Sequence, residues 1–385
     1  MGIVADNINI SKYNSESWIL ASPTSNLIVN KELFNLFEIL INSNSYNDAH
    51  ELFNKYYKKN FSLDQFKNII SSHFNGHGFL VDDNSYKQKK SYINLKIMLF
   101  PSKTCSAISN YLEFMFKKGI FSFFIVVLAI VVTYTIYIYH FNIDNKYQVI
   151  KIFYTFLIFN VSLLIHEFGH ISAYNYFIKK EGLNRHYTSG QIGFGFYFIF
   201  PVYYSNVNQT WSLDKKSRLI INIAGIYFQI VFVLILILSA KLFSVNWFYI
   251  PAYSIILHSL FSLNPFIRND GYWILSDLTG SYNLLQNSKT ELRKFLQNKK
   301  FKNINWKTFY SLGNYILFIL FTTYIILVAK LELFYFPINF IKSVYYLLTY
   351  NLGKIEFNSY WIYYLGFYLI IIKVIRNIIK RIINS

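Results

Sequence analysis

Phe159-Asn160-Val161-Ser162-Leu163-Leu164-Ile165-His166-Glu167-Phe168-Gly169-His170 is an apolar run with three ionisable side chains near its end. On a helix, residues i and i+4 share one face, so His166 and His170 can present two nitrogens to one metal ion. Glu167 would flank that ion and take a proton from bound water. Ionisable groups are costly in lipid, which favours a metal site over two histidines that only hydrogen-bond neighbouring helices.

The composition indicates a polytopic membrane protein. Of 385 residues, 54% are hydrophobic, 21% are aromatic and only 15% are charged, which departs from soluble proteins. Several apolar runs reach the roughly 20 residues that cross a bilayer as a helix. The single cysteine, Cys105, excludes an intrachain disulfide and a thiolate metal cage.

The net charge of +18 would suggest nucleic acid in a soluble protein, but here the basic residues gather beside the apolar runs. The positive-inside rule assigns such segments to the cytoplasm. Residues 1–14 are polar and contain no apolar signal region. We therefore expect a multi-pass protein of the cytoplasmic membrane with both termini in the cytoplasm, the bilayer as a partner and no nucleic-acid partner.

The expected fold is an all-α polytopic membrane protein with about six transmembrane helices, a re-entrant strand segment and a small N-terminal α+β winged-helix-like domain. We expect an N-terminal domain (1–86), a basic linker (87–118), a membrane peptidase core (119–285), and a basic loop with C-terminal membrane helices (286–385). The predicted spans are residues 120–139, 149–178, 219–242, 248–267, 310–329 and 360–378. Residues 334–350 are predicted to be interfacial or re-entrant, and residues 289–307 to form a basic loop.

The N-terminal domain shows strand patterns at 18–21 and 27–29, a helical pattern at 33–41 and a returning strand at 79–81. Two further helices are predicted to start at Ser45 and Ser62, because Asp48 and Gln65 follow three residues later as in capping boxes. The candidate recognition helix, 62–75, carries only Lys67 as a positive charge. That is a poor footprint for DNA and favours a peptide or protein partner.

Residues 190–204 are too short and too broken to span a membrane, and their phenylalanines alternate as in a strand. A strand at membrane depth must pair or face a cavity, since bare backbone groups are not tolerated in lipid. It could be a re-entrant hairpin that pairs with an extended substrate, or an interfacial aromatic loop. The predicted substrate-binding residues are Gly193, Phe194, Gly195, Phe196 and Phe198.

A catalytic zinc commonly has three protein ligands, so the two histidines require a third. Asp270 is the candidate, because Pro265 and Gly271 allow the backbone beside it to unwind toward a cavity. The alternative is a helix-end carboxylate paired with Arg268. Asn264 is a candidate catalytic amide donor to substrate or oxyanion, and its alternative is capping of the broken helix.

His258 is predicted to hydrogen-bond a neighbouring helix rather than bind metal. For Asp277, two roles stay open: orienting a group beside the metal ligands, or a solvated helix end.

The paired motifs resemble the site-2 protease family of intramembrane zinc metalloproteases, specifically its bacterial peptide zinc metalloprotease branch. The likeness covers roughly residues 91–285. The resemblance implies zinc as cofactor, His166, His170 and Asp270 as its ligands, and Glu167 as the catalytic base. The chain departs from the family pattern after Ala224-Gly225, where Ile226 and Gln229 replace a usual proline and asparagine. The motifs that carry the resemblance are HEFGH (166–170), GFG (193–195), FPVYY (200–204), AG (224–225), NP (264–265), DGY (270–272) and SD (276–277).

Residues 10–85 also resemble a PqqD-like domain, which implies capture of a precursor's leader peptide as an added strand. The resulting hypothesis is peptide-bond hydrolysis in a small peptide or membrane-associated substrate, in maturation of a ribosomally made, modified peptide, with an exporter as a further partner. Two alternatives stay open. One is a non-hydrolytic peptide-binding export or immunity protein, and the other is a regulatory protease that cuts a membrane-tethered signalling protein.

Overall fold

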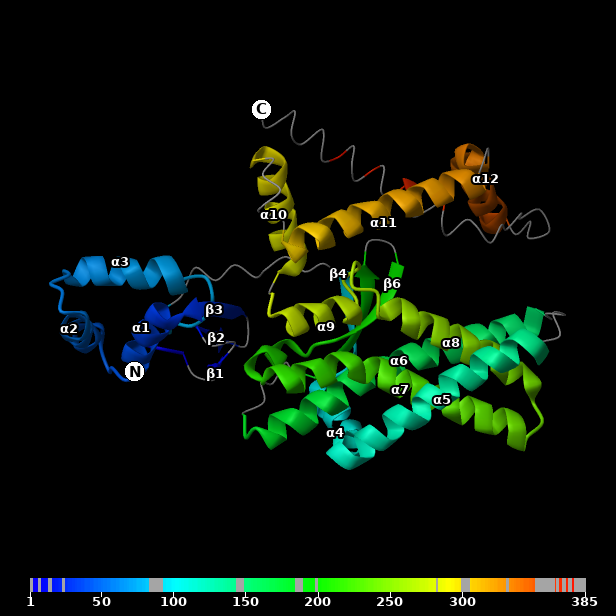
Figure 1. The fold of residues 1–385 in the computed structure, drawn as a ribbon, viewed down its shortest axis with the longest axis horizontal. Helices are drawn as coiled ribbons and strands as arrows, with labels where there is room; N and C mark the ends of the chain where they lie inside the picture. Colours follow the sequence, from blue (N-terminus) through cyan, green and yellow to red (C-terminus); the bar gives the residue numbers. More distant parts are fainter. Residues whose placement is uncertain are drawn as a thin grey trace. The chain divides into compact units, whose positions relative to one another are not determined.

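The protein is described by a computed structural model, which is mostly helical and forms two compact units, Met1–Tyr282 and Asn283–Ser385 (Figure 1). The residues that the structure describes are 3–5, 8–12, 16–22, 25–82, 93–142, 149–183, 190–197, 200–281, 283–298, 305–329, 332–349, 364, 367, 368, 372 and 376.

The N-terminal part of the first unit combines a three-stranded antiparallel sheet with three helices. The order is β1 (Asn9–Lys12), β2 (Ser17–Ala21), β3 (Asn26–Asn30), α1 (Lys31–Ile41), α2 (Tyr46–Tyr57) and α3 (Leu63–Phe74). These elements confirm the predicted strands and helices. Ser62 and Gln65 form the predicted capping box, since each side chain accepts the other residue's backbone N–H. The predicted strand at 79–81 is only an isolated bridge between Val4 and Leu80.

This part of the chain has its own hydrophobic core. Phe37, Phe66, Phe74 and Phe79 are fully buried, and Phe37 packs against the rings of Phe74 and Phe79. Burial of each such side chain contributes roughly 1.5–3 kcal/mol relative to exposure. The phenylalanines of α1 and α3 therefore lie at the centre of this core.

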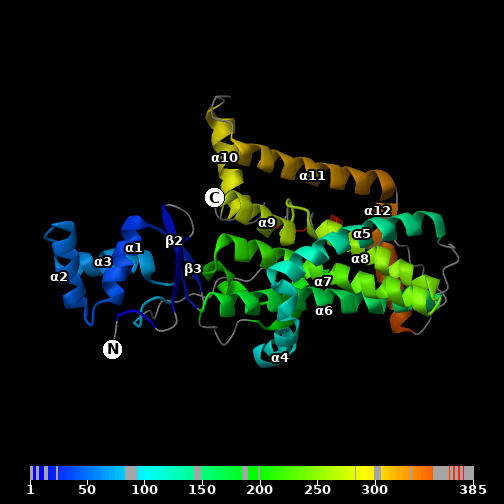
Figure 2. The same ribbon diagram turned by 60° about the horizontal axis from the view of Figure 1, so that its bottom comes forward.

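Three helices in the described part of the chain are long and apolar enough to cross a membrane, which fits membrane insertion. They are α5 (Lys118–Asn142), α6 (Val149–Lys180) and α7 (Lys215–Leu242). The three helices pack together with α8, as Figure 2 shows, and α7 contributes most of the buried side chains. Three of the six or so predicted spans are thus supported by length and composition.

The fourth predicted span, 248–267, differs from the prediction. Its helix, α8 (Tyr249–Ser262), has 14 residues and is about 21 Å long, below the roughly 30 Å of a hydrocarbon core. The helix ends early because the residue before Pro265, Asn264, is disfavoured in the helical conformation. A turn follows, and α9 (Asp270–Thr279) then begins.

The part of the first unit that contains α5, α6 and α7 is not all-α, because it carries a second antiparallel sheet. β4 (Ile93–Phe100), β5 (Ile192–Tyr197) and β6 (Phe200–Ser205) pair in that order (Figure 1). The β5–β6 hairpin bears out the strand prediction for 190–204. β4 is unexpected: it and α4 (Ser102–Leu112) lie within the predicted basic linker, 87–118.

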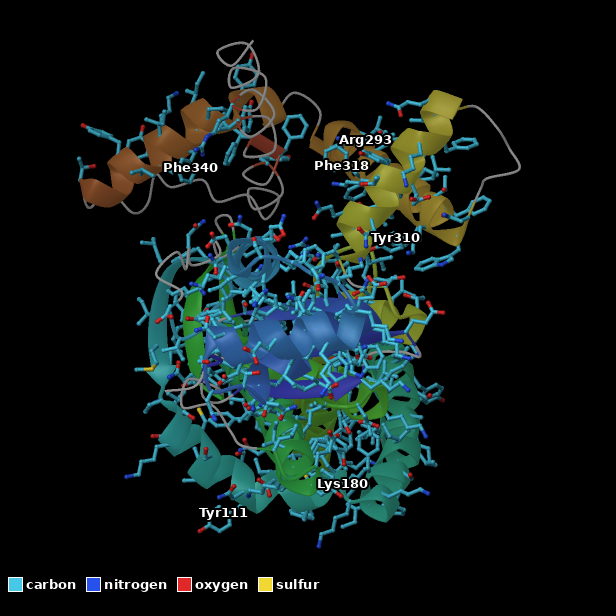
Figure 3. The ribbon with its side chains drawn as sticks, turned by 90° about the vertical axis from the view of Figure 1, so that its left-hand side faces the viewer. Tyr111, Lys180, Arg293, Tyr310, Phe318 and Phe340 are labelled. Carbon is cyan, nitrogen blue, oxygen red and sulfur yellow. The ribbon has the colours of Figure 1, made fainter. Side chains whose placement is uncertain are left out.

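The second unit contains α10 (Leu284–Asn298), α11 (Trp306–Ala329) and α12 (Glu332–Leu348). α10 occupies much of the predicted basic loop, and α11 coincides with the fifth predicted span. The predicted span at 360–378 lies outside the described residues, apart from a few single positions. Figure 3 marks Arg293 on α10 and Tyr310 on α11, and in the first unit it shows Tyr111 of α4 and Lys180 of α6 projecting outward.

Candidate metal centre

The predicted metal ligands come together from two helices. His166 and His170 lie one turn apart on α6, and Asp270 is the first residue of α9. Both histidines are 8% exposed, and the Asp270 side chain is 15% exposed. One ligand atom from each residue lies within 4.8 Å of the others, so the three side chains surround a common point.

The spacing of the ligand atoms suits a tetrahedral ion. His166 Nε2 lies 3.1 Å from Asp270 Oδ2, and His170 Nε2 lies 3.4 Å from Oδ1. The two Nε2 atoms are 3.0 Å apart. Ligands at about 2.0 Å from a tetrahedral zinc are separated by about 3.3 Å. The cluster therefore has nearly the dimensions that zinc requires.

The outer nitrogens of both histidines are held by α7. His166 Nδ1 donates to Gln229 Oε1 at 3.0 Å, and His170 Nδ1 donates to the Ile221 carbonyl oxygen at 2.7 Å. With the proton on Nδ1, each Nε2 carries a lone pair directed at the carboxylate. Partners of this kind orient metal-ligating histidines and fix their tautomer.

The packing of α7 leaves space for an ion. Ile221, Gly225 and Gln229 are spaced by four residues and share the face of α7 that meets the histidines. A Cβ on Gly225 would lie 2.5 Å from the Nε2 atoms of both His166 and His170, so only glycine leaves that space free. Gly271 is similarly constrained, since a Cβ there would overlap the backbone of Leu263.

The three ligating side chains suit a divalent cation, because the acceptor atoms that they bring together do not satisfy one another by hydrogen bonds. Asp270 Oδ2 is buried without a hydrogen-bond donor among the described residues, and two imidazole lone pairs face the same carboxylate. Such acceptor atoms repel one another unless a cation or protons lie between them. Two nitrogens and a carboxylate are ordinary zinc ligands, so these three residues could hold zinc with one position open.

Glu167 follows the first ligand on α6 and is half-buried. Within the described ranges its carboxylate accepts no hydrogen bond, which leaves both oxygens available to a water molecule. A side chain one residue from a ligand lies about 100° around the helix, beside the metal position rather than on it. The geometry is compatible with the predicted role as a proton acceptor.

Asn264 is fixed by a local hydrogen bond. Its Oδ1 accepts the backbone N–H of Phe266 at 3.0 Å, which caps the turn between α8 and α9. Oδ1 thus stabilises this turn, whereas the C-cap of α8 is Leu263 and the N-cap of α9 is Asn269. The Nδ2 group has no acceptor in the part of the chain that the structure describes, so it stays available as a donor.

A buried ion pair anchors α9 and with it Asp270. Arg218 and Asp277 are 3% and 5% exposed, and Arg218 Nε donates to Asp277 Oδ1 at 2.7 Å. Asn222 Nδ2 donates to the second carboxylate oxygen at 2.8 Å. Burial raises the pKa of Asp277, although the Arg218 guanidinium opposes that shift. Of the two alternatives for Asp277, the solvated helix end is wrong.

The predicted substrate-binding strand needs a correction. β5 pairs with β4 on one edge and with β6 on the other, so it has no free edge for an extended peptide. Gly193 is covered by the Tyr204 ring, and Gly195 by Ile93. Among the described strands, the outer edges of this sheet belong to β4 and β6, and β5, which carries the predicted substrate-binding residues, lies between them.

The two phenylalanines of this set that the structure describes lie on β5. Phe194 and Phe196 contact each other, and Phe194 also contacts Tyr203 on β6. Phe198 lies outside the described residues.

Two more polar residues complete the surroundings. His258 Nδ1 on α8 accepts a hydrogen bond from Gln229 Nε2 of α7 at 3.3 Å, which confirms the predicted helix–helix contact. The roles of Gly225 and Gln229 were not foreseen. A buried glutamine in an apolar span was a usable signal, because such polar groups need partners in lipid.

The chain is similar to a protein of Bacillus subtilis (strain 168) named "Putative peptide zinc metalloprotease protein YydH". The two are 24% identical over 119 residues, which cover 30% of this chain and 44% of that protein. The chain thus matches less than half of the relative's length. No family model matches the chain, and no solved structure matches it.

Proposed function

We propose that this protein is a membrane-embedded zinc metalloprotease. The observation that carries the proposal is the convergence of two imidazole nitrogens and the Asp270 carboxylate on one point, with Glu167 beside the first ligand. Three protein ligands with an open fourth position are typical of catalytic rather than structural zinc. The similarity to the Bacillus subtilis protein supports the same activity.

In the proposed hydrolysis, the zinc ligands, Glu167 and Asn264 each have a separate role. Zinc bound by the three ligands would lower the pKa of a water molecule and polarise the scissile carbonyl. Glu167 accepts the water proton on a carboxylate oxygen and passes it to the leaving amine nitrogen. The C–N bond breaks as the new C–O bond is completed, which releases one carboxylate and one amine. The Asn264 Nδ2 group is proposed to donate to the developing oxyanion.

We propose that the substrate pairs as an extended strand with the outer edge of β4. Helical peptides hide their carbonyl groups in internal hydrogen bonds, whereas an added strand exposes every second residue to the enzyme. Leu95, Ile97, Met98 and Leu99 are exposed on β4, while β6 packs against α6. Phe100 at the end of β4 contacts Phe168, the residue after Glu167. This contact links the sheet to the catalytic helix.

The finer identity is also a proposal. We infer an intramembrane protease of the site-2 type in the cytoplasmic membrane, with both termini in the cytoplasm, that acts on a ribosomally made precursor peptide. The N-terminal domain, residues 1–86, is proposed as a winged-helix-like module that captures the leader, with an exporter as a downstream partner. Its shortage of basic residues on α3, where Lys67 is the single cation, supports a peptide over DNA.

The test is the Glu167→Gln variant of the purified full chain. We expect zinc content equal to that of the original protein and loss of peptide cleavage by at least about 100-fold, the usual effect of removing a general base. Glu181→Gln, a carboxylate change just beyond the end of the same helix, should leave both properties unchanged. Zinc and peptide binding without cleavage in the unaltered protein would instead favour the non-hydrolytic binding protein.

A further inference from the structure

Gln229 joins one metal ligand to a third helix. Its Oε1 atom accepts hydrogen bonds from His166 Nδ1 at 3.0 Å and from Ser259 Oγ at 3.1 Å. Its Nε2 group donates to His258 Nδ1, 3.3 Å away on α8. The side chain is fully buried, so each of these polar atoms depends on the others for its partner.

The direction of the Gln229 amide decides whether His166 can bind a cation. With Oε1 toward the ring, His166 carries its proton on Nδ1 and its lone pair on Nε2, facing Asp270. With the amide reversed, Nε2 of Gln229 would face His166 Nδ1 and force the proton onto the ligating nitrogen. Two donors, His166 and Ser259, meet at Oε1, and the acceptor His258 meets the amide nitrogen. In the structure Oε1 faces His166 and Ser259 and the amide nitrogen faces His258, which is the orientation that leaves the lone pair of His166 on Nε2.

The second histidine ligand, His170, is held by a backbone group instead of a side chain. His170 Nδ1 donates to the backbone carbonyl of Ile221, an acceptor that cannot rotate. Of the two histidines, only His166 depends on a side chain that could present either a donor or an acceptor. If the Gln229 amide turned around, His166 could therefore no longer bind the metal ion, although the histidine itself would still be present.

We propose that Gln229 is a positioning residue that holds His166 in its ligating tautomer, and that His258 and Ser259 hold the Gln229 amide in the required direction. The inference rests on the proposed zinc site and assigns no catalytic contact to these three residues. Outer partners of metal-ligating histidines typically contribute 10–100-fold to metal affinity.

The test compares the zinc affinity of detergent-purified full-length variants by competition with a chromophoric chelator. Gln229→Met keeps the length of the side chain, suits an apolar helix and removes the acceptor, so we expect affinity to fall about 10–100-fold. Gln229→Glu restores an acceptor for His166 and should bind zinc more tightly than Gln229→Met. The visible spectrum of the Co²⁺-loaded protein should change in Gln229→Met, because one nitrogen ligand is displaced.

Gln209→Met is the matched control, since Gln209 is also buried and accepts a hydrogen bond from Tyr174, which lies one turn of α6 beyond His170 and is not a ligand. An unchanged affinity in Gln229→Met, an equal loss in Gln209→Met, or no recovery in Gln229→Glu would each overturn the proposal. If Gln229→Met does not fold, His258→Leu replaces it: weaker binding supports the proposal and unchanged binding overturns it. Absence of zinc binding by the unaltered protein would instead remove the proposed function itself.

Discussion

Gly225 of α7 lies directly against the ligating face of His166, so that a Cβ at this position would come within 2.5 Å of the Nε2 atom. Gly225→Ala should therefore push the imidazole off the metal position and weaken zinc binding by at least about tenfold, as when a ligand's support is lost. Chelator competition measures this effect. Gly119→Ala is the control, because no atom lies within 4 Å of its added methyl group. Equal zinc affinity in both variants would show that the glycine serves only helix packing.

Asp270→Asn tests the third ligand. The change removes the negative charge of a proposed ligand. Zinc affinity should therefore fall by more than about 100-fold, the upper end of what is lost when only a hydrogen-bond partner of a ligand is removed. Without zinc, the variant should be at least as stable as the unaltered protein, since an amide relieves the clustering of acceptor atoms beside His166 and His170. Thermal unfolding with and without a chelator separates the two effects. Retention of tightly bound zinc would exclude Asp270 as a ligand.

The Arg218–Asp277 pair should be structural, and a double-mutant cycle can show it. Arg218→Met or Asp277→Leu alone leaves an uncompensated buried charge and should destabilise the protein by about 3–5 kcal/mol. The double variant should lose much less than the sum, because no unpaired charge remains. Denaturant unfolding in detergent provides the measurement. Additive losses would mean that the two side chains are not coupled.

A solvent-accessible pair, with side chains 62% and 30% exposed, serves as the reference for that cycle. Lys294 and Glu291 are 3.0 Å apart and three residues apart on α10. Solvent weakens such a contact, so Glu291→Gln should produce no measurable change in stability.

The β4 edge can be tested with Ile97→Lys and Leu99→Lys together. Exposed lysines protect natural edge strands from pairing, so peptide cleavage should show an increase in KM of about tenfold while zinc content stays constant. Leu242→Lys is the control, an exposed apolar position at the end of α7. Cleavage unaffected by the β4 changes would mean that this face of the strand contacts lipid and not substrate.

Local patterns in the sequence predicted the features whose causes are local. The spacing of His166 and His170 needs only one turn of helix, and the capping box at Ser62 needs only three residues. Asp270 was also identified, although it lies about a hundred positions away, because the break at Pro265 marked an irregular backbone. Turn chemistry and helical periodicity thus account for most of the predicted elements.

The features that were missed depend on how helices and strands are aligned. Gly225 and Gln229 meet the histidines because α6 and α7 run antiparallel in one register, which no single segment encodes. β4 was assigned to a basic linker, although Ile93, Leu95 and Ile97 alternate with polar residues as in a strand. Its pairing partner, β5, lies about a hundred residues later in the chain. The alternating pattern is short and is surrounded by lysines, which favoured the interpretation as a linker.

The carbonyl oxygen of Ile221 that holds His170 is an atom every amino acid carries. Replacement of the isoleucine side chain leaves that acceptor unchanged, whereas most replacements at Gln229 remove one. Substitutions can therefore change the hydrogen bond that holds His166, but they have little effect on the one that holds His170. Among descendants of this chain, we expect position 221 to vary among apolar residues, while position 229 stays limited to side chains that can accept a hydrogen bond from His166.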